Sequence, residues 1–172
     1  ISDRVKESVF NILRWQVPDC RFLDLFAGTG GVGIEALSRG AEHAVFVEKE
    51  LKAIRVLREN LRATQMTGQA RVLHEDVFRL LLLANQSVDP ADRFDIIYVA
   101  PPQYQDLWAQ TLIALDGHPL LAPEGIIVAQ IFPKEYRALP LQDLVLTDQR
   151  KYGSTMLCFY ERHHGLVDPP TP

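Results

Sequence analysis

The sequence predicts an α/β fold, in which a mostly parallel, seven-stranded sheet is covered by helices and ends in an antiparallel hairpin. Short apolar runs alternate with longer amphipathic segments, which is the rhythm of such a fold. The first five apolar runs have the continuous hydrophobic pattern of parallel strands buried on both faces. The last two runs leave no room for a crossover helix between them, so we expect them to pair in antiparallel fashion.

The expected elements follow one another in a regular order. An amphipathic helix over residues 3–13 opens the chain and carries Val5, Val9, Phe10 and Leu13 on one face. Further helices are expected over residues 31–38, 51–63, 78–83 and 104–115. Strands are expected over residues 21–26, 44–48, 70–74, 94–99, 125–131, 143–149 and 155–161. Residues 150–154 would then connect the two strands of the hairpin.

We expect the chain to form one domain. Its 172 residues, 47% of them hydrophobic, suit a single globular core. The domain should cover residues 1–162, with a disordered, proline-rich tail over residues 163–172. No run of about 18 apolar residues occurs, so no membrane span is expected. Because the chain begins at Ile1 rather than Met, we also expect a segment to precede it.

Charge and cysteine usage narrow the classes of partner. A net charge of −4 disfavours nucleic acid as a partner, because phosphate contacts need Lys and Arg. Local basic groups could still reverse this; they are Arg4, Lys6 and Arg14 near one end and Lys134, Arg137, Arg150 and Lys151 near the other. Cys20 and Cys158 lack the spacing of a zinc site or a disulfide scaffold, so we expect no metal and a reducing compartment.

Three strand ends carry residues that suit an adenosine-containing cofactor. Ligands of an open α/β sheet bind beyond the carboxyl ends of its strands. The first strand leads into the glycine-rich segment over residues 24–30, and Glu48 at the second strand end suits the two hydroxyls of a ribose. Asp76 follows the third strand, placed to accept from an adenine amino group with Val77 or Phe78 against the ring. Taken alone, Asp76 could equally be a helix cap.

The glycine pattern leaves two cofactors open. Gly28, Gly30 and Gly33 match a dinucleotide-binding pattern, and Glu48 follows at the expected distance. Asp24 favours S-adenosylmethionine, because a carboxylate in an apolar strand needs donors or a cation, such as an ammonium or sulfonium group. The terminal hairpin is typical of the Rossmann-like class I methyltransferases that use this cofactor. The residues expected to bind it are Asp24, Phe26, Ala27, Gly28, Gly30, Glu48, Lys49, Asp76, Val77 and Ala100.

The fourth strand leads into a candidate reaction loop, Ala100-Pro101-Pro102-Gln103-Tyr104. Two consecutive prolines make a rigid loop whose carbonyls cannot join a helix and so point into the cleft. Such carbonyls can accept hydrogen bonds from an exocyclic amine and help localise its lone pair toward a methyl donor. We therefore expect Pro101, Pro102, Gln103 and Tyr104 to act in catalysis. No cysteine lies near the loop, so covalent attack on a base is disfavoured.

From residue 2 to residue 160 the chain resembles the RsmD family, which methylates the exocyclic amine of a guanine in bacterial small-subunit ribosomal RNA. The resemblance is carried by residues 2–13 (SDRVKESVFNIL), 23–30 (LDLFAGTG), 35–41 (EALSRGA), 46–48 (FVE) and 151–153 (KYG). It implies S-adenosylmethionine as cofactor, held by Asp24, Gly28, Gly30, Glu48 and Asp76. It also implies small-subunit rRNA as partner, within a ribosomal particle, and a monomeric protein in the cytoplasm, or in a plastid if the source is a plant.

One departure from the family pattern concerns the reaction loop. Family members read Asp-Pro-Pro followed by Tyr or Phe, whereas this chain has Ala100 and Gln103 at the outer positions. We expect an active loop in which the Pro101 carbonyl and Gln103 accept from the amine and Tyr104 stacks on the base. The alternatives are a weakly active or non-catalytic module that binds the cofactor and RNA, and an enzyme for a small molecule or protein amine.

Arg4 is a further candidate for contact with the substrate. A cation near the start of a helix opposes the helix dipole, which suggests another role for this side chain. We expect Arg4 to face the reaction loop or an RNA phosphate, and an ordinary surface charge is the alternative.

Overall fold

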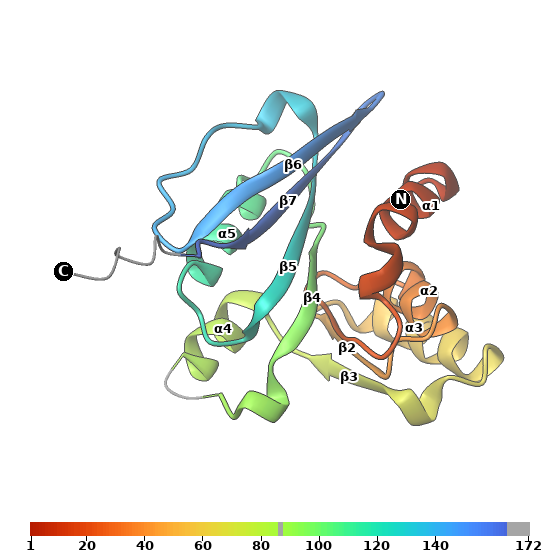
Figure 1. The fold of residues 1–172 in the computed structure, drawn as a ribbon. Coiled ribbons are helices and arrows are strands. Elements are labelled where there is room, and N and C mark those ends of the chain that lie inside the picture. Colours follow the sequence, from red (N-terminus) through yellow and green to blue (C-terminus); the bar gives the residue numbers. More distant parts are fainter. Residues whose placement is uncertain (86–87, 165–172) are drawn as a thin grey trace.

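A seven-stranded sheet forms the middle layer of the fold, which the computed structural model describes for residues 1–85 and 88–164 (Figure 1). Its strand order is β3-β2-β1-β4-β5-β7-β6. Strands β1 to β5 run parallel, and β7 lies antiparallel between β5 and β6. The bounds are β1 (Arg21–Asp24), β2 (His43–Glu48), β3 (Ala70–His74), β4 (Phe94–Val99), β5 (Leu121–Ile131), β6 (Leu144–Tyr152) and β7 (Thr155–Arg162). The predicted fold class is confirmed.

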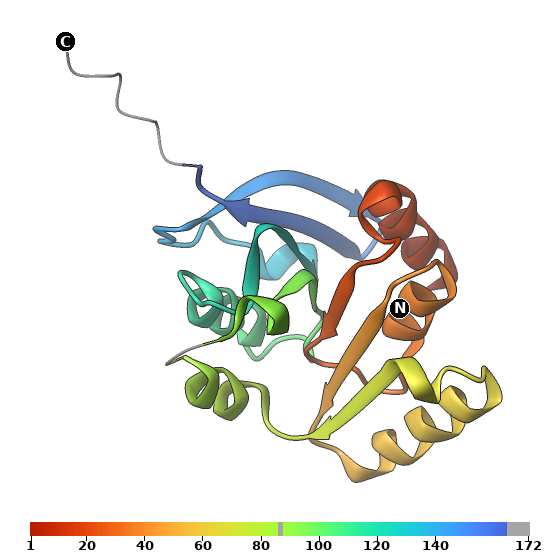
Figure 2. The ribbon, with the colours of Figure 1, turned by 60° about the horizontal axis from the view of Figure 1, so that its bottom comes forward.

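Helices cover both faces of this sheet. Figure 2 shows α1 (Asp3–Leu13), α2 (Gly31–Ser38) and α3 (Leu51–Ala63) on one side, and α4 (Val77–Ala84) and α5 (Leu107–Leu115) on the other. The stripe predicted for α1 is buried against the sheet at Val5, Val9, Phe10 and Leu13. Each face therefore has its own apolar core, as a sheet buried on both sides requires.

The boundaries of several predicted elements differ from the structure. Strand β1 ends at Asp24 rather than at residue 26, and β5 begins at Leu121 rather than at residue 125. Helix α5 begins at Leu107 rather than at residue 104, because Tyr104 (φ 64°) and Asp106 (φ 56°) adopt left-handed conformations that a helix excludes. The terminal hairpin is longer than predicted. Its strands pair up to Tyr152 and Thr155, so only two residues connect them where the sequence suggested a five-residue loop.

Asp116, directly after α5, fastens the start of the hairpin to the rest of the sheet. Its carboxylate accepts hydrogen bonds from the backbone N–H groups of Gln142, Asp143 and Leu144, at 2.8, 2.8 and 2.9 Å. Burial raises the pKa of the Asp116 carboxyl, but these three donors outweigh burial and hold the pKa below its ordinary value. The negative charge thus fixes where β6 begins.

Three further expectations concern membrane-spanning helices, the two cysteines and the C-terminal tail. In the part that the structure describes, no helix has the length and apolar character needed to cross a membrane. Both Cys20 and Cys158 are buried and free. Most of the expected disordered tail, residues 165–172, lies outside the described residues. Its first residue, His163, donates its backbone N–H to the carbonyl of Asp143 at 2.5 Å.

Candidate functional site

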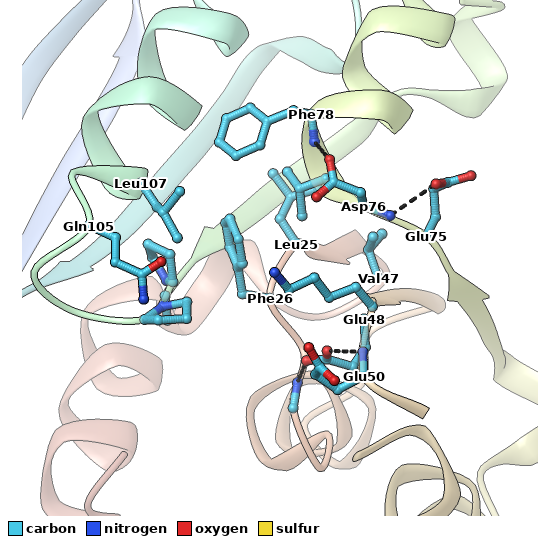
Figure 3. A pocket seen from close by; sticks show the side chains of 16 residues that line it. Leu25, Phe26, Val47, Glu48, Glu50, Glu75, Asp76, Phe78, Gln105 and Leu107 are labelled. Carbon is cyan, nitrogen blue, oxygen red and sulfur yellow. Dashed lines mark hydrogen bonds between the residues drawn. The ribbon is translucent and has the colours of Figure 1, made fainter. Parts of the chain in front are cut away.

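A cavity of about 580 Å³ opens at the carboxyl ends of β1 to β4, where the sequence placed the cofactor (Figure 3). Its volume lies in the range of small-molecule and cofactor pockets. The predicted residues that line it are Phe26, Gly28, Glu48, Lys49, Asp76, Val77, Ala100, Pro101 and Pro102. In Figure 3 the ring of Phe26 stands between the wall that carries Gln105 and the wall that carries Glu48 and Asp76. The expected cofactor segments and the reaction loop therefore share one cavity.

The glycine-rich turn brings the backbone to the cavity edge. Gly28 (φ 56°) and Gly30 (φ 89°) both adopt left-handed backbone conformations, and Gly30 caps the start of α2. A side chain at position 30 would collide with Leu57 of α3. Glycine suits position 30 because it adopts a positive φ without strain and leaves space for Leu57. Gly30 therefore lies on the side of the turn that packs on α3, whereas Gly28 lines the cavity.

Glu48 is held at the end of β2 by two backbone donors. Its Oε1 accepts from the N–H of Gly28 at 3.0 Å, and its Oε2 accepts from the N–H of Glu50 at 2.8 Å. Each carboxylate oxygen has a further lone pair after one such bond. The side chain is thereby oriented at the cavity wall and can still accept hydrogen bonds from a pair of ligand hydroxyls.

Asp76 caps helix α4, as the alternative interpretation of this residue suggested. Its Oδ1 accepts from the backbone N–H groups of Phe78 and Arg79, at 2.9 and 3.1 Å. Among the described residues, its Oδ2 has no hydrogen-bond donor, and Asp76 lines the cavity beside Phe78. The cap and the ligand role are compatible, because they use different oxygens of one carboxylate.

Asp24 lies beneath the glycine turn rather than in the cavity wall. It is 2% exposed, and its Oδ1 has no hydrogen-bond partner within the described part of the chain. Burial raises the pKa of the Asp24 carboxyl to about 7, against the opposing effect of the N–H groups of Phe26 and Gly33. A buried carboxylate with a free oxygen is costly without a donor or a cation. Ala27, which is buried, and Gly30 likewise stand outside the residues that line the cavity.

Acidic groups dominate the charge of the cavity wall. Lys49 is the one basic residue that lines it within the described residues, and the acidic ones are Glu48, Glu50, Glu75 and Asp76. Glu50 and Glu75 were not predicted as wall residues from the sequence. Pyrophosphate prefers a neutral or positive, donor-rich turn, so this wall disfavours a dinucleotide and suits a ligand with a positive charge.

The reaction loop reaches the cavity through Ala100, Pro101 and Pro102. Gln103, expected to supply a second acceptor, is exposed and does not line the cavity. Gln105 lines it instead, because the left-handed turn at Tyr104 changes the direction of the chain. Gln105 was not predicted as a site residue, and no signal in the sequence distinguishes it from Gln103.

Tyr104 lies on the outer side of the loop. The residue is 70% exposed, and its ring contacts the ring of Phe132, with centroids 5.3 Å apart. Its backbone N–H donates to Oε1 of Glu135 at 2.6 Å, which ties the loop to the short helix η4 (Pro133–Glu135). Arg137 and Asp106 add an ion pair of 3.2 Å between the same two segments. The loop is therefore fastened from outside the sheet.

Arg4 has no observed contact that would support its expected role. The side chain is exposed on α1, and within residues 1–85 and 88–164 no acidic group forms an ion pair with it. Its backbone carbonyl accepts from the hydroxyl of Ser8 at 2.9 Å. Contact with a substrate remains a prediction for this residue.

Comparison with known proteins gives a consistent picture. Residues 1–161 match the family described as Conserved hypothetical protein 95. YlbH of Bacillus subtilis (strain 168), provisionally named an rRNA methyltransferase, is 37% identical over 161 residues, covering 94% of this chain and 86% of that protein. The ribosomal RNA small subunit methyltransferase D of Escherichia coli (strain K12) is 36% identical over 129 residues, or 75% of this chain and 62% of that protein. The match thus spans less than two thirds of the Escherichia coli enzyme.

A solved structure extends the likeness to three dimensions. The Escherichia coli protein yhhF, provisionally described as a methyltransferase, superposes with a TM-score of 0.81 at 31% identity. The superposition covers 94% of this chain and 87% of that one.

Proposed function

The chain belongs to the RsmD family of methyltransferases, and on this premise we propose that it transfers a methyl group from S-adenosylmethionine to the N2 amine of a guanine in small-subunit rRNA. The observation that carries the proposal is the shared cavity. It joins an acidic pocket built for an adenosine-type cofactor to a Pro-Pro loop suited to an amine. Neither half alone would specify methyl transfer.

The residues present fit S-adenosylmethionine better than a dinucleotide. Glu48 would accept from the ribose hydroxyls, and Asp76 with Phe78 would hold the adenine. The free oxygen of Asp24 lies beneath the glycine turn, where its charge would favour the ammonium group. Bound S-adenosylmethionine supplies an electrophilic methyl group on a positively charged sulfur, which the acidic wall favours.

At the reaction loop, the chain's own groups position the amine. Among the described residues, no backbone N–H donates to the carbonyl of Pro101 or Pro102, so both carbonyls keep their acceptor capacity. We assign the Pro101 carbonyl as acceptor of one amine N–H, with the Gln105 amide in place of the expected Gln103. With its N–H groups held by these acceptors, the amine nitrogen would direct its lone pair toward the methyl group that bound S-adenosylmethionine would supply, and the amine proton would leave to solvent.

The identity of the acceptor rests on the relatives. The Escherichia coli relative is named for small-subunit rRNA, and its matched region includes most of this chain. We extend that substrate class to this chain, presented within a ribosomal particle to a monomeric protein in the cytoplasm. The substitution of Ala100 for an acidic residue supports a second candidate, a module that binds S-adenosylmethionine and RNA but methylates weakly or not at all.

A methyl-transfer assay separates the two candidates. Small ribosomal subunits from cells lacking the protein are incubated with tritiated S-adenosylmethionine, and the rRNA nucleosides are analysed by mass spectrometry. We expect label in rRNA as N2-methylguanosine. Label on another base or on protein would overturn the guanine-N2 assignment. Absence of label, with calorimetric binding of S-adenosylmethionine intact, would establish the non-catalytic candidate.

A further inference from the structure

A second groove, of about 340 Å³, lies beside the reaction loop and outside the cofactor cavity. One wall is formed by Phe132, Pro133 and Lys134 after β5, and the other by Lys151, Gly153 and Ser154 at the hairpin tip. Figure 1 shows the far end of β5 and the hairpin tip at the same, upper end of the sheet. We call this the hairpin groove.

The sheet register holds the two walls of the hairpin groove together. Met156 of β7 pairs with Ile131 of β5 on one side and with Lys151 of β6 on the other. Ile131, Met156 and Lys151 thus lie side by side across three neighbouring strands. Phe132 follows Ile131 directly, so this pairing fixes the position of Phe132 relative to Lys151. The groove is therefore part of the rigid fold.

Phe132 also connects the hairpin groove to the reaction loop. Its ring contacts that of Tyr104, and Glu135 fixes the backbone of Tyr104 from the same segment. Tyr104 is 70% exposed, so an aromatic surface continues from the loop to the groove. Exposed aromatic faces of this kind bind nucleobases by stacking.

The uncompensated positive charge at this end lies at the hairpin groove. Two nearby arginines are neutralised: Arg137 pairs with Asp106 and Arg150 with Asp148, each at 3.2 Å. Lys134 and Lys151 are exposed and form no ion pair with any residue that the structure describes. Glu135 is the acidic residue nearest in sequence, and one of its oxygens is occupied by Tyr104.

We propose that the hairpin groove binds the RNA nucleotide next to the target base, and this rests on the proposed function. The neighbouring base stacks on the ring of Phe132, with Tyr104 at its edge, and its phosphate lies between Lys134 and Lys151. A groove with an aromatic wall and two unpaired cations matches both parts of a nucleotide. It also places a binding surface for RNA on a chain whose net charge is −4.

The test compares two double variants of the full chain with equal loss of charge. Lys134→Ala/Lys151→Ala removes the cations of the hairpin groove. Arg58→Ala/Arg62→Ala removes two cations from α3 that line a different groove. Binding of a fluorescein-labelled 12-nucleotide oligouridylate is followed by anisotropy over a range of KCl concentrations, and thermal unfolding confirms that each variant is folded.

We expect the lysine variant to lose about tenfold in RNA affinity and about 0.7 in the slope of log K against log salt, as for one single-strand phosphate that is no longer neutralised. The arginine variant should change affinity less than twofold. Calorimetric binding of S-adenosylmethionine should be unchanged in both. Equal losses in the two variants, or no loss in the lysine variant, would overturn the proposal.

A third variant tests the aromatic wall separately from charge. Phe132→Leu keeps apolar volume but removes the stacking face, so it should weaken binding of oligouridylate and leave binding of inorganic polyphosphate unchanged. An equal effect on both probes would contradict base stacking. The methyl-transfer assay keeps the two proposals apart. Unchanged KM for small subunits in the lysine variant removes the groove assignment alone, whereas an inactive wild type removes the proposed reaction and leaves the binding measurements to decide the groove.

Discussion

The backbone N–H of Gly28 donates to Oε1 of Glu48 at 3.0 Å, which joins the turn after β1 to the end of β2. The other oxygen of Glu48 accepts from the N–H of Glu50 at 2.8 Å. One carboxylate therefore orders two loops of the cavity wall before any ligand arrives. A preordered acceptor pair of this kind lowers the entropy cost of binding a ribose.

Glu48→Ala should weaken S-adenosylmethionine binding by about 100-fold, because two charge-assisted hydrogen bonds to the ribose are lost. Glu48→Gln should also weaken it, since an amide N–H in place of one oxygen would face the N–H of Gly28 or Glu50. Titration calorimetry measures both. Glu59→Ala, on the exposed face of α3, is the matched control and should bind normally. If Glu48→Ala and Asp24→Ala both kept wild-type affinity, the assigned pocket would be wrong.

Ala100→Asp restores the acidic residue of the family pattern at the mouth of the reaction loop. Ala100 lines the cavity and is only partly buried, so a carboxylate there can reach solvent or the amine. We expect methyl transfer to stay the same or to rise by up to about 100-fold, the order of effect of one well-placed polar group. Single-turnover rates on small subunits measure this. A large loss of rate would show instead that the site is rebuilt around alanine.

Glu135 acts on the reaction loop as a positioning residue. Glu135→Ala removes the acceptor that holds the Tyr104 N–H, so kcat should fall by about tenfold while KM for S-adenosylmethionine stays unchanged. Glu135→Gln keeps a carbonyl oxygen at the same place and should restore most of the rate. Failure of Gln to rescue would indicate that the charge of Glu135, rather than its hydrogen bond to the loop, is what matters.

The sequence predicted the arrangement of the site better than its details. The strand-end residues Glu48, Asp76 and Pro101 were expected to meet because parallel strands end at one edge of a sheet, and they do line one cavity. Gln105 lines the cavity in place of Gln103 because Tyr104 adopts a left-handed backbone conformation. This conformation is unfavourable for tyrosine, and no sequence pattern predicts it.

Long-range contacts account for the other differences between sequence and structure. The hydrogen bond that holds the backbone of Tyr104 is accepted by Glu135, in the segment after β5, and the spacing of these residues in the sequence does not predict it. The position of Asp24 below the turn depends on which face of β1 it occupies, and a strand buried on both faces gives no alternation from which to predict it.

Asp24 should make the stability of the ligand-free protein depend on pH in an unusual direction. Burial raises the pKa of its carboxyl from 3.8 to about 7, so between these values the folded state binds more protons than the unfolded state. The contribution to stability is thus fully present below about pH 4 and is lost as the pH rises toward 7. Its upper limit is on the order of 4 kcal/mol, from about 1.4 kcal/mol for each pKa unit.

Asp24→Asn removes this ionisation while it keeps the size of the side chain. Urea unfolding of both proteins at pH 5 and pH 8 should show the variant gaining stability relative to wild type by a few kcal/mol at the higher pH. Saturating S-adenosylmethionine should shrink that gain, because an ammonium group bound on the other side of the glycine turn would stabilise the charged form of Asp24 in the wild type. The variant side chain carries no charge for the ammonium group to stabilise. Identical pH dependence in the two ligand-free proteins would mean that Asp24 is already ionised at pH 5. An undiminished gain with ligand bound would mean that the ammonium group lies elsewhere.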